Sequence, residues 1–302
     1  MKPSGIGGQA VLEGIMMKNK EKYAVAVRKA DGEIALEVNQ YQSITKNHKL
    51  LRLPFIRGVF NFIDAMILGM KTLNYSSSFL LEEEESEEKK DKSKALLMGV
   101  VTVISFAIAI LLFMVFPLFV VQGLQRIHPF SSTVQAVLEG ILRIALFVGY
   151  ILCISLMKDI RRTFMYHGAE HKCISCIENG WDLTVENVKK SSKVHKRCGT
   201  SFLFFVMFIS ILCFMIIRVE TLGLRILTRL LFIPIIAGIS FEIIMLAGKS
   251  DNFFINLLSK PGLYLQALTT KEPDGGMIEV AIEAVEAVFD WSAYQEKSEP
   301  NH

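Results

Sequence analysis

The chain lacks the features that mark several classes of protein. Its 302 residues carry a net charge of only +3, so the composition gives no support for nucleic-acid binding. Five cysteines, an odd number scattered through a long chain, do not indicate a secreted disulfide framework. The first 20 residues contain no continuous apolar core, and we expect no signal peptide. The sequence therefore favours neither a nucleic-acid-binding nor a secreted protein.

Apolar residues are what the chain has in excess. Hydrophobic residues make up 51% of the sequence and the mean hydropathy is +0.39, which is more apolar than an ordinary soluble protein. Four segments are long and apolar enough to predict membrane-spanning helices, at 95–121, 134–157, 202–217 and 226–247. We therefore predict a mainly α-helical membrane protein of about four spans, with the lipid bilayer as its first partner.

The loops between these spans differ in basic charge. The segment 158–201 carries nine lysines and arginines, whereas the loop before it carries one and the loop after it carries two. Because basic loops stay on the cytoplasmic side, we expect both termini and the 158–201 loop in the cytoplasm. Thiols remain reduced there and are available as metal ligands.

The regions outside the spans have distinct compositions. The sequence predicts a cytoplasmic β-rich region at 1–53, an amphipathic interfacial helix at 54–81, a charged solvated linker at 82–94, the membrane domain at 95–247 and a helical tail at 248–302. In the first region, Asp31-Gly32 fits the turn of a hairpin between strands at 23–28 and 33–38. In the tail, Asp274 can cap an amphipathic helix that packs on these strands or on a second copy of the chain.

The densest cluster of metal-capable side chains lies just after the second span. His167, Glu170 and His171 form an H-x-x-E-H pattern. On a helix the two histidines share one face, where they can hold a zinc-like ion while the carboxylate acts as a general base. We expect this pattern to bind metal, with Glu170 as the candidate catalytic residue.

Further ligands can come from the same loop. Asn179-Gly180 is a plausible helix stop, and Thr184 can cap a second short helix before the third span begins. A hairpin of this kind returns the chain toward the first two histidines, and the candidates to complete the site are Glu178, His195 and Cys198. Imidazole with thiolate or carboxylate suits Zn²⁺. The C-x-x-C pair Cys173 and Cys176 is better explained as small apolar packing.

Other charged residues lie in or beside the spans. Glu139, Arg143 and Glu242 are predicted at membrane depth, where ionisable groups face a bundle interior or a wet cavity. Glu139 and Arg143 are spaced to pair with each other, and Glu242 either pairs with Arg143 or Arg229 or has a functional role. Arg161, Arg162 and Arg197 are candidates to hold an anionic headgroup at the interface.

Several short motifs occur together in the chain, at 7–17, Arg57-Gly58 with Asp64, 166–172, 197–202, 237–242 and 261–273. Together they resemble the YqhQ-like family of bacterial polytopic membrane proteins of unknown function. Lys196 stands where the family pattern has proline, and Cys173 and Cys176 lie outside the family motifs. The resemblance implies a metal-associated protein of the bacterial cytoplasmic membrane and supplies no reaction.

Two functions from different classes follow. The first is a zinc-dependent hydrolase acting on a membrane-proximal or lipid-linked substrate, with Glu170 as general base. The second is a non-enzymatic membrane scaffold or channel-like assembly in which the histidine and cysteine cluster is structural. A second copy of the chain is a candidate partner in either case.

Overall fold

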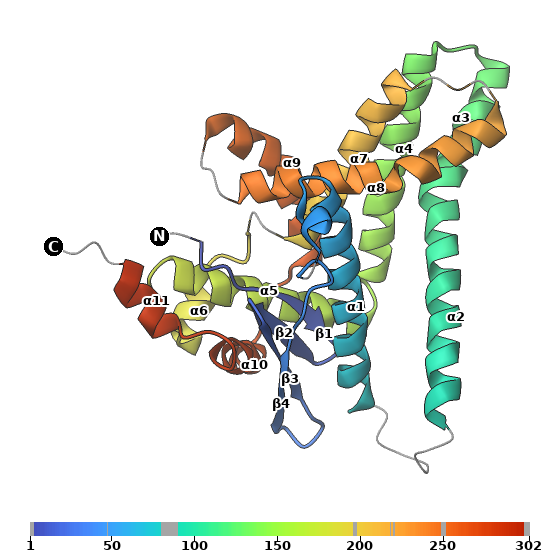
Figure 1. The fold of residues 1–302 in the computed structure, drawn as a ribbon. Helices are drawn as coiled ribbons and strands as arrows, with labels where there is room; N and C mark the ends of the chain where they lie inside the picture. The colour runs from blue at the N-terminus through green and yellow to red at the C-terminus, as the bar shows by residue number, and fades with distance from the viewer. Residues whose placement is uncertain are drawn as a thin grey trace. The chain divides into compact units, whose positions relative to one another are not determined.

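The computed structural model describes residues 3–46, 48–79, 90–195, 198–217, 219, 221–248 and 252–298 (Figure 1). The chain forms two compact units, and each is described by itself. Unit 1 comprises Met1–Leu81, Ile151–Phe205 and Ala237–His302, and unit 2 comprises Glu82–Tyr150 and Val206–Ile236. Most of the linker predicted at 82–94 lies outside the described residues, and its last five residues begin a helix.

Unit 1 contains a four-stranded antiparallel sheet in the order β1-β2-β3-β4. The strands are β1 (Gly7–Val11), β2 (Gly14–Asn19), β3 (Lys22–Arg28) and β4 (Ile34–Gln40). The predicted hairpin between β3 and β4 is confirmed, with Gly32 in the left-handed region at φ 89°. Neither β1 nor β2 was predicted, because their glycines and methionines have weak strand signals; the pairing of β2 with β3, and of β1 with β2, decides their conformation.

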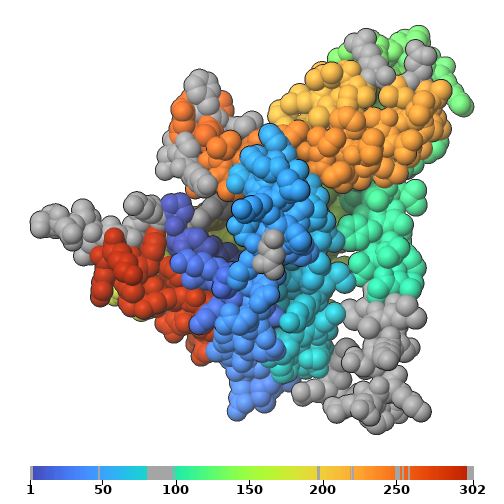
Figure 2. All heavy atoms as spheres, viewed as in Figure 1, coloured from blue at the N-terminus to red at the C-terminus, as the bar shows by residue number. Residues whose placement is uncertain are grey.

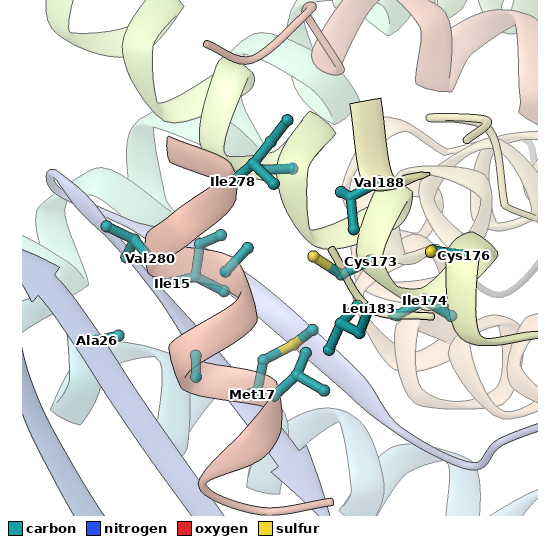
Figure 3. Close-up of a cluster of buried hydrophobic side chains, with 14 of the residues drawn as sticks. Ile15, Met17, Ala26, Cys173, Ile174, Cys176, Leu183, Val188, Ile278 and Val280 are labelled. Atoms are coloured by element: carbon teal, nitrogen blue, oxygen red, sulfur yellow. The ribbon is translucent and has the colours of Figure 1, made fainter. Parts of the chain in front are cut away.

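One face of this sheet carries the main hydrophobic core. It is covered by α5 (Lys158–Glu178), α6 (Val185–Lys190) and α10 (Gly275–Glu286). Figure 3 shows Ile15 and Met17 of the sheet facing Ile278 of α10 and Cys173 of α5. Cys173 and Cys176 are fully buried here, as the packing interpretation predicted.

Helix caps in this core follow the predicted residues. Thr184 accepts a hydrogen bond from the backbone amide of Asn187 and Asp274 accepts one from Met277, so both predicted caps are confirmed. The prediction left two partners open for the C-terminal amphipathic helix, and α10 packs on the N-terminal sheet.

The opposite face of the sheet packs against α1 (Ile56–Ser78). Leu68 of α1 joins a second buried cluster with Val11, Met16, Tyr23, Val25 and Val27. Because successive side chains of a strand point to opposite faces, Met16 contacts α1 while its neighbours Ile15 and Met17 contact α5 and α10.

Four segments of the described chain are long and apolar enough to cross a membrane. They are Gly99–Ile127, Ser132–Ile154, Gly199–Ile216 and Leu222–Ala247. The first begins at Gly99 within α2 (Lys90–Ile110) and continues through a π-helical turn η2 (Leu111–Val115) and α3 (Phe116–Ile127). The others are α4 (Ser132–Ile154), α7 (Gly199–Ile216) and α8 (Leu222–Ala247). The four predicted spans and the helical membrane fold are therefore confirmed.

Unit 2 contains a buried polar network, which corrects the predicted pairing of Glu139 with Arg143. Glu139 forms an ion pair with Arg229 instead. Arg143 donates to the Ser210 hydroxyl at 2.7 Å and, through Nε, to the Phe113 carbonyl at 2.8 Å. That carbonyl lies four residues before Pro117, which has no N–H to donate to it.

Glu242 belongs to unit 1, and its predicted pairing with Arg143 or Arg229 is also wrong. Its carboxylate receives two bonds from the Arg57 guanidinium, at 2.7 and 2.5 Å. Sequence spacing could not identify this partner, because Arg57 lies 185 residues away.

The rest of the tail is helical. The apolar pieces predicted on either side of Pro261 belong to one helix, α9 (Phe253–Thr269), and the chain ends with α11 (Trp291–Ser298).

Candidate metal centre

The H-x-x-E-H residues lie on α5, as the pattern predicted. His167 and His171 occupy adjacent turns of one face, and their ring centroids are 4.4 Å apart. Glu170 lies beside them, with its Oε2 4.0 Å from His167 Nε2. Glu170 and His171 are buried, because this face of α5 turns toward β1 and the start of α7.

Cys198, the residue just before α7, completes a group of three metal-capable side chains. One ligand atom from each of His167, His171 and Cys198 lies within 4.8 Å of the other two. The Cys198 Sγ is 3.3 Å from His167 Nε2. Zinc bonds of about 2.3 Å to sulfur and 2.0 Å to nitrogen place two tetrahedral ligands about 3.5 Å apart. The three side chains therefore fit one tetrahedral ion with little movement.

Backbone carbonyls fix how the two imidazoles face. His167 Nδ1 lies 3.0 Å from the Thr269 carbonyl, and His171 Nδ1 lies 2.9 Å from the Lys193 carbonyl. A carbonyl only accepts, so each Nδ1 carries the proton and donates it. The Nε2 atoms are the ones left to face Cys198. Metal-binding histidines in proteins are commonly oriented in this way, with one ring nitrogen donating to a carbonyl and the other free to bind the ion.

The environment of Cys198 stabilises a thiolate. Its Sγ receives a bond from the backbone amide of Thr200 at 3.4 Å, in the first turn of α7. Burial acts to raise the pKa of the Cys198 thiol, but hydrogen bonds from His167 and His171 outweigh it and hold this pKa well below its usual range. Burial acts to lower the pKa of His167, yet Cys198 and Glu170 together raise it to about 9. Both pKa shifts favour a thiolate beside an imidazolium when no metal is bound.

A small cavity adjoins the three side chains. Its volume is about 110 Å³, and its walls include Gly7, Gly8, Glu170 and His195 besides the three candidate ligands. Because a water molecule occupies about 30 Å³, the cavity has room for a few of them. A β-carbon on Gly8 would lie 2.5 Å from the Met16 carbonyl and 3.0 Å from Glu170 Cγ. The glycine is therefore needed for β1 to pass this close to Glu170.

The structure separates the other candidate ligands from this group. His195 Nε2 lies 3.2 Å from Glu178 Oε2, and the other oxygen of Glu178 receives two bonds of 2.8 Å from Ser4. His195 lines the cavity, and its ring is 6.1 Å from that of His171. Glu178 and His195 thus form a neighbouring pair, outside the three-ligand group.

Of the three predicted headgroup arginines, the structure describes Arg161 and Arg162. Arg162 donates two hydrogen bonds to Glu13, at 2.5 and 2.6 Å, and Arg161 is exposed. Arg197 lies outside the described residues.

Residues of α9 support the centre and were not identified as functional from the sequence. Gln266 is fully buried, accepts a bond from the His195 amide, donates to the His195 carbonyl and lies 3.2 Å from His171 Nδ1. Thr269 supplies the carbonyl that orients His167. In the sequence, only their position within the 261–273 motif of the family resemblance pointed to Gln266 and Thr269.

The fold and the site define a class, a polytopic helical membrane protein with a buried histidine and cysteine cluster. A family model described as "Protein of unknown function (DUF1385)" matches residues 53–291, and the chain belongs to this family. It is 37% identical over 310 residues to "Uncharacterized protein YqhQ" of Bacillus subtilis (strain 168), covering 99% of this chain and 97% of that protein. The predicted family resemblance is therefore confirmed. No solved structure matches the chain.

Proposed function

We propose that the protein is a membrane metalloprotein that holds one divalent cation, with Zn²⁺ the best fit, between His167, His171 and Cys198. One observation carries the proposal: a ring nitrogen of each imidazole and the Cys198 sulfur lie within 4.8 Å of one another, and the Nδ1 atom of each imidazole is held by a backbone carbonyl. Two nitrogens and a sulfur form a donor set that zinc prefers. Three protein ligands leave a fourth position for water or substrate, which is typical of catalytic zinc sites.

We further propose that the site is hydrolytic. A bound Zn²⁺ supplies Lewis acidity and makes water more acidic. Glu170 is placed to accept the proton, because its carboxylate lies 4.0 Å from His167 Nε2 and lines the cavity. His167 and His171 keep their orientation during this transfer, because their Nδ1 protons are held by backbone carbonyls.

The proposed substrate is membrane-proximal, either a lipid-linked molecule or a chain segment close to the bilayer. Cys198 immediately precedes Gly199–Ile216, a candidate span, which brings the centre to the membrane edge. The many lysines and arginines of the 158–201 loop support a cytoplasmic position for this side of the membrane domain and for both termini, because basic loops stay on the cytoplasmic side.

One observation favours a structural role for the same site. The cavity of about 110 Å³ is small, and an ion there would join α5 to the start of α7. In that case the fourth position is filled by a protein group, and the protein acts as a membrane scaffold.

Metal content tests the proposed binding. The purified full-length protein is expected to contain one zinc per chain, and His171→Ala is expected to lose it. His128→Ala is the matched control, because His128 is exposed and outside the cluster. Metal-free wild-type protein that takes up no zinc on addition would refute the proposal, and so would equal zinc content in the two variants.

Cobalt substitution separates the catalytic from the structural role. If the fourth position is open, adding acetohydroxamate to the Co²⁺-loaded protein changes its visible spectrum. A closed four-ligand site gives no change and refutes the hydrolase. Glu170→Gln is expected to retain the metal, because Glu170 is outside the three-ligand group. If this variant loses the metal, Glu170 is a ligand and its role as general base is wrong.

A further inference from the structure

A basic stretch joins the sheet to α1 and has no assigned role. Residues 38–63 contain no aspartate or glutamate but include Lys46, Lys49, Arg52 and Arg57. This stretch contains the helical turn η1 (Lys49–Arg52) and the first turns of α1. In Figure 2 it appears in lighter blue on the viewed face of unit 1.

Beside this stretch lies a cavity of about 480 Å³. Four cationic side chains line it, from Lys20, Lys46, Arg52 and Arg57, together with one acidic residue, Glu21. The cavity is more than four times the volume of the one at the metal centre. Serine, threonine and asparagine side chains complete its polar wall.

The cations outnumber the carboxylates that neutralise them. Lys46 pairs with Glu21 at 2.6 Å, and Arg57 pairs with Glu242. Lys20 and Arg52 take part in no ion pair between described residues, and Arg52 donates only to the carbonyls of Thr45 and Lys46. Two of the four lining cations, Lys20 and Arg52, are therefore left without a carboxylate partner among the described residues.

The start of α1 lies against the ends of two candidate spans. A β-carbon on Gly58 would meet Gly238 Cα at 3.0 Å, so α1 contacts α8 closely near its C-terminal end. On the other side, the ring of Phe62 lies 5.4 Å from that of Phe202, in the first turn of α7. Glu242 is five residues before the end of its span, which is about 7.5 Å along a helix. The cavity residue Arg57, which pairs with Glu242, therefore lies within about two helical turns of the end of this candidate span.

Large apolar side chains on the same stretch face outward. Leu50 is 74% exposed, and Leu53, Phe55 and Ile56 are also exposed. Apolar and basic side chains alternating on a short exposed segment are typical of elements that lie in a membrane interface. The apolar side chains fit the acyl region, and the cations fit the phosphates above it.

We propose that the cavity formed by Lys20, Lys46, Arg52 and Arg57 binds the phosphate-bearing headgroup of an anionic phospholipid, while Leu50 and its neighbours insert among the acyl chains. The lipid source is favoured over free phosphate because the exposed apolar side chains border the cations. This site is independent of the metal centre and does not rest on the proposed hydrolysis.

The test uses the full-length protein in nanodiscs that contain phosphatidylglycerol and phosphatidylcholine. Leu50→Trp adds a reporter at the apolar border, and acyl-brominated lipids quench it. Brominated phosphatidylglycerol is expected to quench this added fluorescence more than brominated phosphatidylcholine at equal mole fraction. Each cation is expected to contribute about fivefold to the preference for phosphatidylglycerol over phosphatidylcholine. Adding Lys20→Gln and Arg52→Gln together should therefore reduce this preference on the order of 30-fold. Lys189→Gln with Lys297→Gln is the matched control, because it removes two exposed cations far from this stretch in sequence.

The outcomes separate the alternatives. A preference for phosphatidylglycerol that is lost in the Lys20 and Arg52 variant, and retained in the control, supports the site. Equal quenching by the two lipids in wild-type background overturns it. Displacement of phosphatidylglycerol by millimolar inorganic phosphate would also overturn it, since the cavity would then be a free-phosphate site.

Discussion

Replacing Cys198 by serine removes the sulfur ligand while leaving the shape of the side chain almost unchanged. Cys198 is 6% exposed, and Thr200 can still donate its amide to the new hydroxyl. The two imidazoles remain oriented by Thr269 and Lys193. The substitution therefore tests the ligand and not the fold.

The expected loss of zinc affinity follows from the number of ligands. Zinc sites with four protein ligands bind with about 10–16 kcal/mol, or about 3 kcal/mol per ligand. A loss of about 3 kcal/mol corresponds to about 100-fold weaker binding. At a free zinc concentration 100 times the wild-type Kd, zinc stabilises the wild-type fold by about 2.7 kcal/mol. The same zinc stabilises Cys198→Ser by only about 0.4 kcal/mol, because its concentration then equals the weakened Kd.

Two measurements check this arithmetic on detergent-solubilised protein. Competition with a chromophoric chelator gives the Kd, and unfolding with and without zinc gives the stabilisation. Cys153→Ser is the control, because Cys153 is an exposed thiol outside the three-ligand group. If Cys198→Ser binds zinc as tightly as Cys153→Ser, the thiolate is not a ligand and the assignment fails.

Two further substitutions test the surroundings of the centre and of the spans. Gln266→Ala removes a buried amide that holds the His195 backbone beside His171; we expect zinc affinity to fall about 10- to 100-fold with one ion still bound per chain, measured by chelator competition. An unchanged affinity would mean that Gln266 supports the fold alone. Glu139→Gln leaves the buried Arg229 charge without its partner and should lower the free energy of unfolding by about 3–5 kcal/mol. Changing both residues to glutamine should cost less than the single change, and a fully additive loss would count against their pairing.

The proposed metal centre and the proposed lipid site both lie near the start of α7. Cys198 immediately precedes α7, and Arg57 lies on the helix whose Phe62 packs on the first turn of α7. A lipid held at the cavity would bring its headgroup to the membrane edge at which the metal centre is proposed to act.

Features set by local sequence were predicted well. The four spans follow from continuous apolar runs, because a helix satisfies its own backbone hydrogen bonds in lipid wherever it packs. The caps at Thr184 and Asp274 depend on backbone amides only three residues away. His167, Glu170 and His171 meet on one face because helical geometry requires it.

Only the tertiary structure decided which distant groups meet. Glu139 pairs with Arg229 on α8 and not with Arg143, which lies one turn along α4. The contact between α4 and α8 therefore decides the partner of this carboxylate. Cys198 joined the two histidines, while Glu178 and His195 paired with each other. The sequence by itself thus determined the membrane-spanning helices and the metal-capable pair on α5. The third candidate ligand beside this pair, the carbonyls that orient the two imidazoles and the adjoining cavity all depend on contacts between segments that are remote in the sequence, and no local spacing encodes the geometry of those contacts.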